Sequence, residues 1–306
     1  MDLEVTQQHI DDAAARTNPH IRRTPVVSLG DVLERGFSLS LKLDHTQPTG
    51  SFKVRGAFSL LTAVEPQNGV AAASGGNFGI AVAHACRTLG YKATVFVPET
   101  SPREKIDRIR DNAEVHIVPG YYHEALAECE RFVADSGAFM AHAYDQREVV
   151  AGQGTAAKEI LEQVPDVGAI LVAVGGGGLI AGIASWCRDD VKVIATESER
   201  CSSFHAARLA GTPVKVEVGG VASSSLGASM IGDHAWYASR WVDQSVLVTD
   251  DQIASSQRWL WETAKLAVEP SAATTVAALL SGAYQPASGE HVVALLSGAN
   301  FDPSTI

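Results

Sequence analysis

From about residue 69 the chain alternates regularly between strand-like and helix-like segments. Each helix-length crossover requires parallel strands, because parallel neighbours cannot be joined by a tight hairpin. The alternation therefore predicts an α/β fold built on open parallel sheets. Before it, we expect a helix at 5–17 with Thr6 as its cap and a half-buried strand at 39–43. The expected strands are then 69–73, 93–97, 115–118, 169–174, 192–196 and 291–296, and the expected helices are 77–89, 102–110, 123–134, 149–164, 179–188, 250–267 and 271–281.

The composition excludes several classes of protein. A chain of 306 residues is long enough for two lobes, and its net charge of −11 argues against nucleic acid or an anionic membrane as a main partner. The uncharged run 167–187 contains four glycines, so we expect strand, loop and helix there, not a membrane span. No secretion signal precedes the first helix. Four cysteines without CxxC spacing predict reduced thiols in a cytoplasmic protein: Cys86, Cys129, Cys187 and Cys201.

Lys53 lies among small and apolar residues just after a Pro–Gly turn. With Ser51 as the expected N-cap, the lysine would occupy the first turn of a helix. Both the helix dipole and partial burial lower the pKa of an ammonium group in that position. Such a lysine can act as a Schiff-base nucleophile and as a general base. An isolated lysine beside a turn is more often a solvated surface residue, so this interpretation depends on the motifs elsewhere.

A first glycine-rich segment, 73–79, joins an expected strand to an expected helix. Backbone N–H groups converge at the start of such a helix and can bind a carboxylate or phosphate. A tight turn whose glycines serve only packing would have the same residues. The candidate anion-binding residues are Ser74, Gly75, Gly76 and Asn77.

A second glycine-rich segment follows the strand expected at 169–174. Four consecutive glycines allow the backbone to wrap closely around a phosphate dianion at the start of the next helix. The segment is neither a GxGxxG dinucleotide motif nor a P-loop, because Ile180 breaks the first pattern and no Lys-Ser/Thr pair ends the second. The predicted phosphate-binding residues are Gly175, Gly176, Gly177 and Gly178.

The last expected strand ends in the segment Ser297–Asn300. In open α/β sheets, ligands lie at the carboxyl ends of the strands, where a serine could contact one. A serine at this place could equally cap or turn the chain. Together with Lys53 and the two glycine segments, however, it completes one consistent set: an amine, an anion cradle, a phosphate site and a hydroxyl group.

These motifs resemble those of the fold-type II pyridoxal 5′-phosphate (PLP) enzymes and, within them, the serine/threonine dehydratase family. The resemblance covers nearly the whole chain and implies two open parallel-sheet lobes of the tryptophan synthase β-like kind. It implies a large PLP-binding domain over 1–66 and 144–306 and a small domain over 67–143 that grips the substrate. The motifs that carry it are Gly50–Ala57, Ser74–Asn77, Ala151–Thr155, Gly175–Gly178, Val268–Pro270 and Ser297–Asn300.

The resemblance also assigns roles. Lys53 would bond PLP covalently and, once freed by the substrate amine, would remove the α-proton. The implied contacts are the cofactor phosphate with Gly175, Gly176, Gly177 and Gly178, the pyridine nitrogen with Ser297, the ring hydroxyl with Asn77, the ring with Phe52, the vicinity of the cofactor with Glu269, and the substrate carboxylate with Ser74, Gly75, Gly76 and Asn77.

The reaction implied is β-elimination, which converts a β-hydroxy-α-amino acid such as L-threonine or L-serine to a 2-keto acid and ammonia. A neutral serine at the ring nitrogen would make PLP a milder electron sink and disfavour transamination. Racemisation and β-replacement of the cysteine synthase kind stay open as alternatives on the same fold. A non-catalytic nucleotide-binding protein is more remote, since it leaves Lys53 and Ser297 unexplained. The family habit is a homodimer.

Three positions depart from the family pattern. Gly75 stands where racemising relatives carry a serine, so a dedicated racemase is not expected. Relatives that bind a divalent cation use a Glu and an Asp six residues apart, whereas here Glu197 is followed by Ser203, so no metal is expected. Phe78 replaces the usual histidine after the asparagine, which leaves the preferred hydroxy amino acid open.

Overall fold

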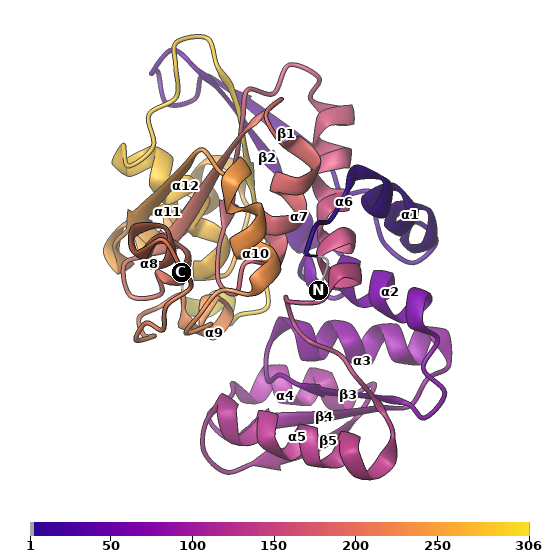
Figure 1. The fold of residues 1–306 in the computed structure, drawn as a ribbon. Helices are drawn as coiled ribbons and strands as arrows, with labels where there is room; N and C mark the ends of the chain where they lie inside the picture. Colours follow the sequence, from indigo (N-terminus) through magenta and orange to yellow (C-terminus); the bar gives the residue numbers. More distant parts are fainter. Residues whose placement is uncertain (1–2, 306) are drawn as a thin grey trace.

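The strands of the computed structural model, which describes residues 3–305, form two separate sheets (Figure 1). Their positions follow the predicted alternation, and short strands appear that the pattern did not reveal, at 26–30, 139–140 and 244–248. The strands are β1 Val26–Gly30, β2 Ser38–Lys42, β3 Val70–Ala73, β4 Ala93–Pro98, β5 Glu114–Val118, β6 Phe139–Met140, β7 Ala169–Ala173, β8 Lys192–Ser198, β9 Gln244–Val248 and β10 His291–Leu295.

The helices begin within two residues of the predicted starts. Thr6 caps the first of them in a reciprocal capping box with His9, as expected. In the stretch before β9, which no periodicity describes, short helices connect the strands. The helices are α1 Gln7–Thr17, α2 Lys53–Val64, α3 Asn77–Leu89, α4 Arg103–Arg110, α5 Tyr122–Ser136, α6 Arg147–Gln163, α7 Gly178–Cys187, α8 Ser203–Ala210, α9 Ser223–Leu226, α10 Asp233–Ala238, α11 Asp250–Ala264 and α12 Pro270–Ser281, with 3-10 turns η1 Asp44–Thr46, η2 Ser239–Trp241 and η3 Pro303–Thr305.

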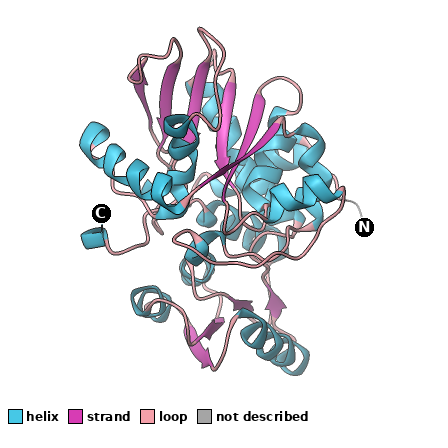
Figure 2. Ribbon diagram, turned by 90° about the vertical axis from the view of Figure 1, so that its left-hand side faces the viewer, coloured by secondary structure: helices cyan, strands magenta, loops and turns pink. Residues whose placement is uncertain are grey.

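The larger sheet has the strand order β1-β2-β10-β7-β8-β9, and among its described pairs β1 with β2 is antiparallel while the others are parallel. Alternate residues of its strands enter two cores. Ile170 and Val172 pack with α1, α6, α7 and α10, whereas Leu171 and Ala173 pack with α11 and α12. Helices therefore cover both faces (Figure 2), which is the arrangement that buries a parallel sheet.

The smaller sheet has the order β5-β4-β3-β6 and is parallel throughout its described pairs. Its strands supply apolar residues to α3 and α4 on one face and to α5 on the other. It occupies the lower part of Figure 1, with α2 between it and the larger sheet. Both sheets confirm the predicted α/β fold. The division into domains after residues 66 and 143 stays a prediction.

The uncharged run at 167–187 forms β7, the glycine loop and α7, as predicted. Throughout residues 3–305, every helix falls short of the length and apolar character that a membrane crossing demands. The four cysteines are buried and free of disulfide bonds.

The strand expected to be half-buried at 39–43 is instead buried on both faces, so that expectation was wrong. It lies between β1 and β10, and its polar side chains meet α6 in place of water. Lys42 Nζ lies 2.6 Å from Glu159 Oε2, and Arg55 pairs with Asp44 at 2.7 Å and with Glu159 at 2.7 Å. Burial lowers the pKa of Lys42, although Asp44 and Glu159 oppose the change. This buried charge network links β2, α2 and α6.

Replacing Arg55 by leucine should lower the free energy of unfolding by about 3–5 kcal/mol, because two buried carboxylates lose their partner. The matched control is Arg23→Ala, which breaks the pair with Glu162 whose side chains are 55% and 45% exposed. That change should cost about 0–1 kcal/mol. Urea denaturation measures both. Equal small losses in the two variants would show that the buried network does not stabilise the fold.

Candidate active site

Lys53 is the first residue of α2, and the loop before it is fixed by the loop after β10. Phe52 N donates to Ser297 O at 2.9 Å, and Ala299 N donates to Gly50 O at 2.9 Å. Backbone pairing of these two loops brings the lysine and the serine of the sequence motifs to one place. The expected cap was wrong: Phe52 occupies the N-cap position, and the buried Ser51 hydroxyl has no partner among the described residues.

The Lys53 amine is held in an apolar environment. Burial lowers its pKa to about 8, and the negative charge of Glu269 partly opposes this change. Nζ donates to the Ala143 carbonyl at 2.8 Å and lies 5.1 Å from the centre of the Phe52 ring and 5.8 Å from that of Phe78. The lowered pKa that the sequence indicated is thus present, with burial as its first cause. Near pH 8 about half of these amines are neutral and nucleophilic.

The four glycines form the loop between β7 and α7. No described residue accepts a hydrogen bond from the backbone N–H groups of Gly175–Gly178, which therefore stay available to a ligand at the start of α7. Gly177 has φ +91°, and a Cβ there would overlap Ala235. A Cβ on Gly176 would overlap the Tyr144 ring, and one on Gly178 would lie 2.7 Å from the Tyr144 carbonyl oxygen. Larger residues would therefore disrupt the loop.

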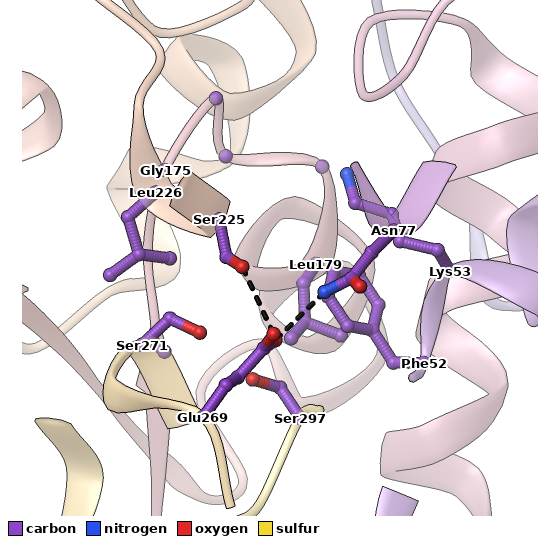
Figure 3. A pocket seen from close by; sticks show the side chains of 14 residues that line it. Phe52, Lys53, Asn77, Gly175, Leu179, Ser225, Leu226, Glu269, Ser271 and Ser297 are labelled. Carbon is purple, nitrogen blue, oxygen red and sulfur yellow. Dashed lines mark hydrogen bonds between the residues drawn. The ribbon is translucent and has the colours of Figure 1, made fainter. Parts of the chain in front are cut away.

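One pocket brings these groups together (Figure 3). Its free N–H groups suit the phosphate of PLP, and the unpartnered buried hydroxyl of Ser271 adds a polar group at its wall. Lys53 supplies the amine that PLP requires, and Ser297 adds a hydroxyl at the end of β10. The residues present thus fit this cofactor. The pocket is lined by Phe52, Lys53, Asn77, Ala173, Gly175, Gly176, Gly177, Gly178, Leu179, Ser225, Leu226, Glu269, Ser271 and Ser297.

Glu269 is the centre of a buried polar cluster in this pocket. Its two carboxylate oxygens accept from Asn77 Nδ2 at 2.8 Å and from Ser225 Oγ at 3.1 Å (Figure 3). Lys105 Nζ lies 3.9 Å from Oε2, and both side chains are 3% exposed. No sequence signal points to Ser225, which lies in the stretch without periodicity. Lys105 lies in a helix whose many charges suggest a solvated surface.

The first glycine segment lies beside the pocket, and Asn77 is its member in the pocket lining, while Ser74, Gly75 and Gly76 are outside that lining. The Ser74 hydroxyl accepts from the backbone N–H groups of Gly76 at 3.3 Å and Gly79 at 3.1 Å. It therefore shapes the turn into α3. A Cβ on Gly75 would overlap the Ser101 hydroxyl. Ser101 thus occupies the space that a side chain at position 75 would need.

Glu197 and Ser203 form hydrogen bonds within the protein. The buried Glu197 carboxylate accepts from the backbone N–H groups of Phe204 at 2.9 Å and His205 at 2.7 Å, while Ser203 Oγ donates to Gly175 O at 3.1 Å. Burial raises the pKa of Glu197 to about 8, against the effect of the two N–H groups. Within residues 3–305, no group of three or more His, Cys, Asp or Glu side chains could hold a metal ion. That the protein needs no metal stays a prediction.

The model of a family described as pyridoxal-phosphate dependent enzymes matches residues 17–298. The chain belongs to this family. It is 36% identical to a putative threonine dehydratase of Sinorhizobium fredii, over 90% of this chain and 86% of the relative. It is also 36% identical to an L-threonine ammonia-lyase of Geobacter sulfurreducens, over 92% and 72%.

Solved structures agree with this assignment. Maize serine racemase superposes with a TM-score of 0.94 at 29% identity, over 98% of this chain and 95% of the racemase. A bacterial threonine deaminase, from the organism abbreviated T.th., gives a TM-score of 0.90 at 33% identity, over 97% and 99%. The resemblance and the fold type inferred from the motifs are therefore confirmed, and the cofactor of the family is PLP.

The reactivity of Lys53 in the PLP-free protein should rise with pH with a midpoint near 8, because burial disfavours the charged amine. Peptide mapping after brief treatment with an amine-reactive reagent at a series of pH values measures this midpoint. In Glu269→Gln the midpoint should fall further, because the carboxylate raises the pKa. A wild-type midpoint near 10.5, the ordinary lysine value, would contradict the burial argument.

Gly75→Ser should lower the free energy of unfolding by about 1–3 kcal/mol, as expected for overpacking against Ser101. Adding Ser101→Gly should restore most of the loss, because it removes the overlapping hydroxyl. Gly76→Ser is the matched control: its Cβ would meet its nearest neighbour, Ser224 O, at an ordinary 3.6 Å. Urea denaturation of the four proteins measures the coupling. Equal losses at positions 75 and 76, with no rescue, would refute it.

Proposed function

We propose that this chain catalyses PLP-dependent β-elimination of a β-hydroxy-α-amino acid, such as L-threonine or L-serine, to a 2-keto acid and ammonia. The observation that carries the proposal is an amine of lowered pKa, Lys53, in one pocket with four free backbone N–H groups. Relatives named L-threonine ammonia-lyase support the same reaction class.

When bound, PLP supplies an electron sink for the pair left at the substrate α-carbon. The N–H groups of Gly175–Gly178 would hold its phosphate, and Lys53 would hold it covalently. Once the substrate amine has replaced Lys53, Nζ is free to remove the α-proton. With a pKa of about 8, this amine is a base suited to near-neutral pH. Phe52 would pack near the ring, and Glu269 would lie close to it.

Ser297 would contact the pyridine nitrogen from the end of β10. A neutral hydroxyl does not hold a proton on that nitrogen as a carboxylate would. Less charge is then stabilised at the α-carbon, so prompt departure of the β-hydroxyl is favoured over reprotonation. The substrate carboxylate would be bound by the Ser74–Asn77 segment, where the first backbone N–H groups of α3 give a positive helix end.

Racemisation and β-replacement are the secondary candidates. The likeness to maize serine racemase favours the former, but Ser101 excludes a side chain at position 75. A non-catalytic nucleotide-binding role leaves Lys53 without a purpose. We also propose a small substrate-gripping domain at 67–143, a large PLP-binding domain at 1–66 and 144–306, a homodimer, and a cytoplasmic location in line with the four free cysteines.

The purified protein should be yellow, and borohydride should fix PLP on Lys53 alone. Mass spectrometry of the peptides locates the label, and Lys53→Arg provides the control that retains a cation but cannot be labelled. Wild type supplied with L-threonine or L-serine should release equal amounts of keto acid and ammonia. A label on another lysine would overturn the site, and an inverted amino acid without ammonia would indicate racemisation instead.

A further inference from the structure

Asn77 uses both ends of its side-chain amide inside the protein. Nδ2 donates to Glu269 Oε1 at 2.8 Å, and Oδ1 accepts from Asn300 Nδ2 at 2.8 Å. All three side chains are buried, with residue exposures of 7%, 2% and 5% for Asn77, Glu269 and Asn300. Bonds to an amide in such a place determine which end faces which neighbour.

The neighbours of Asn300 fix its own orientation. Its Oδ1 accepts from the guanidinium of Arg108, a group that only donates. Its Nδ2 also donates to the Thr49 carbonyl at 2.9 Å, a group that only accepts. Turning the Asn300 amide would place donor against donor on one side and acceptor against acceptor on the other. Arg108 therefore orients Asn300, and Asn300 together with Glu269 orients Asn77.

The backbone leaves room for this chain of contacts at two glycines. Gly50 has φ +75°, and a Cβ there would overlap Asn300 Oδ1. A Cβ on Gly298 would overlap Glu269 Oε1 and approach Asn77 Nδ2 to 3.3 Å. Arg108 reaches the site from the surface of α4 and donates also to the Thr49 carbonyl at 3.3 Å. The orientation of a pocket residue is thus tied to a helix of the smaller sheet.

We propose that Asn300 and Arg108 are positioning residues that keep Asn77 turned with an N–H group, and not its oxygen, toward the ring oxygen of PLP. The inference rests on the proposed function. Oδ1 of Asn77 is occupied by Asn300, and one N–H of Nδ2 by Glu269, so the second N–H is the polar group that remains for the cofactor. A donor there stabilises the ring oxygen in its ionised form.

The test compares the absorbance of the substrate-free PLP-bound proteins. A proton on the ring oxygen moves absorption from the visible into the near ultraviolet, so the ratio of the two bands reports the donor. In Asn300→Asp, a carboxylate oxygen faces Asn77 Oδ1 and should turn that amide, lowering the visible share about two- to tenfold. Arg108→Met should shift the ratio in the same direction by less. Arg110→Met, an exposed arginine of the same helix, is the control and should leave it unchanged.

An unchanged ratio in Asn300→Asp, with PLP still on Lys53, would overturn the positioning role while leaving the proposed function intact. A merely structural role would lower the denaturation midpoint of the variants without moving the ratio, and would also overturn it. Should Asn300→Asp fail to fold or to bind PLP, Arg108→Met decides by the same ratio. Failure of wild type to take up PLP on Lys53 would instead remove the proposed function itself.

Discussion

The site depends on the backbone pairing between the loop before α2 and the loop after β10. The bonds from Phe52 N to Ser297 O and from Ala299 N to Gly50 O join segments from opposite ends of the chain. Because β10 lies in the middle of the larger sheet, the loop that carries Lys53 is held against the most rigid part of the fold. The lysine can therefore be buried without help from a side-chain cap. Its lowered pKa follows from that burial.

Much of the fold could be predicted because hydrophobic periodicity acts locally. Helix starts such as Thr6 before α1 and strands such as β7 are encoded by neighbouring residues. The depth of a strand is not encoded in this way. Ser40 and Lys42 alternate with leucines as they would in a half-solvated strand, and only the sheet order shows that α6 covers them.

The site was predictable where its chemistry lies in contiguous motifs, as for Lys53, the four glycines and Ser297. It was not predictable where a partner comes from a distant helix. In α4, Lys105 and Arg108 stand among other charges, and nothing local distinguishes them from the exposed Arg103. Their contacts with Glu269 and Asn300 depend on how the smaller sheet packs against the larger one. Family resemblance supplied roles, and the packing supplied the residues that hold those roles in place.

Tyr144 gives the glycine loop a consequence beyond its own shape. Its ring and backbone form one wall of the loop at Gly176 and Gly178, yet it belongs to the segment that leads from β6 of the smaller sheet into α6. A ligand held by the loop would therefore also brace this crossover, and part of its binding free energy would appear as mechanical stiffness between the two sheets. By thermodynamic linkage, whatever steadies the crossover also tightens the hold on the ligand.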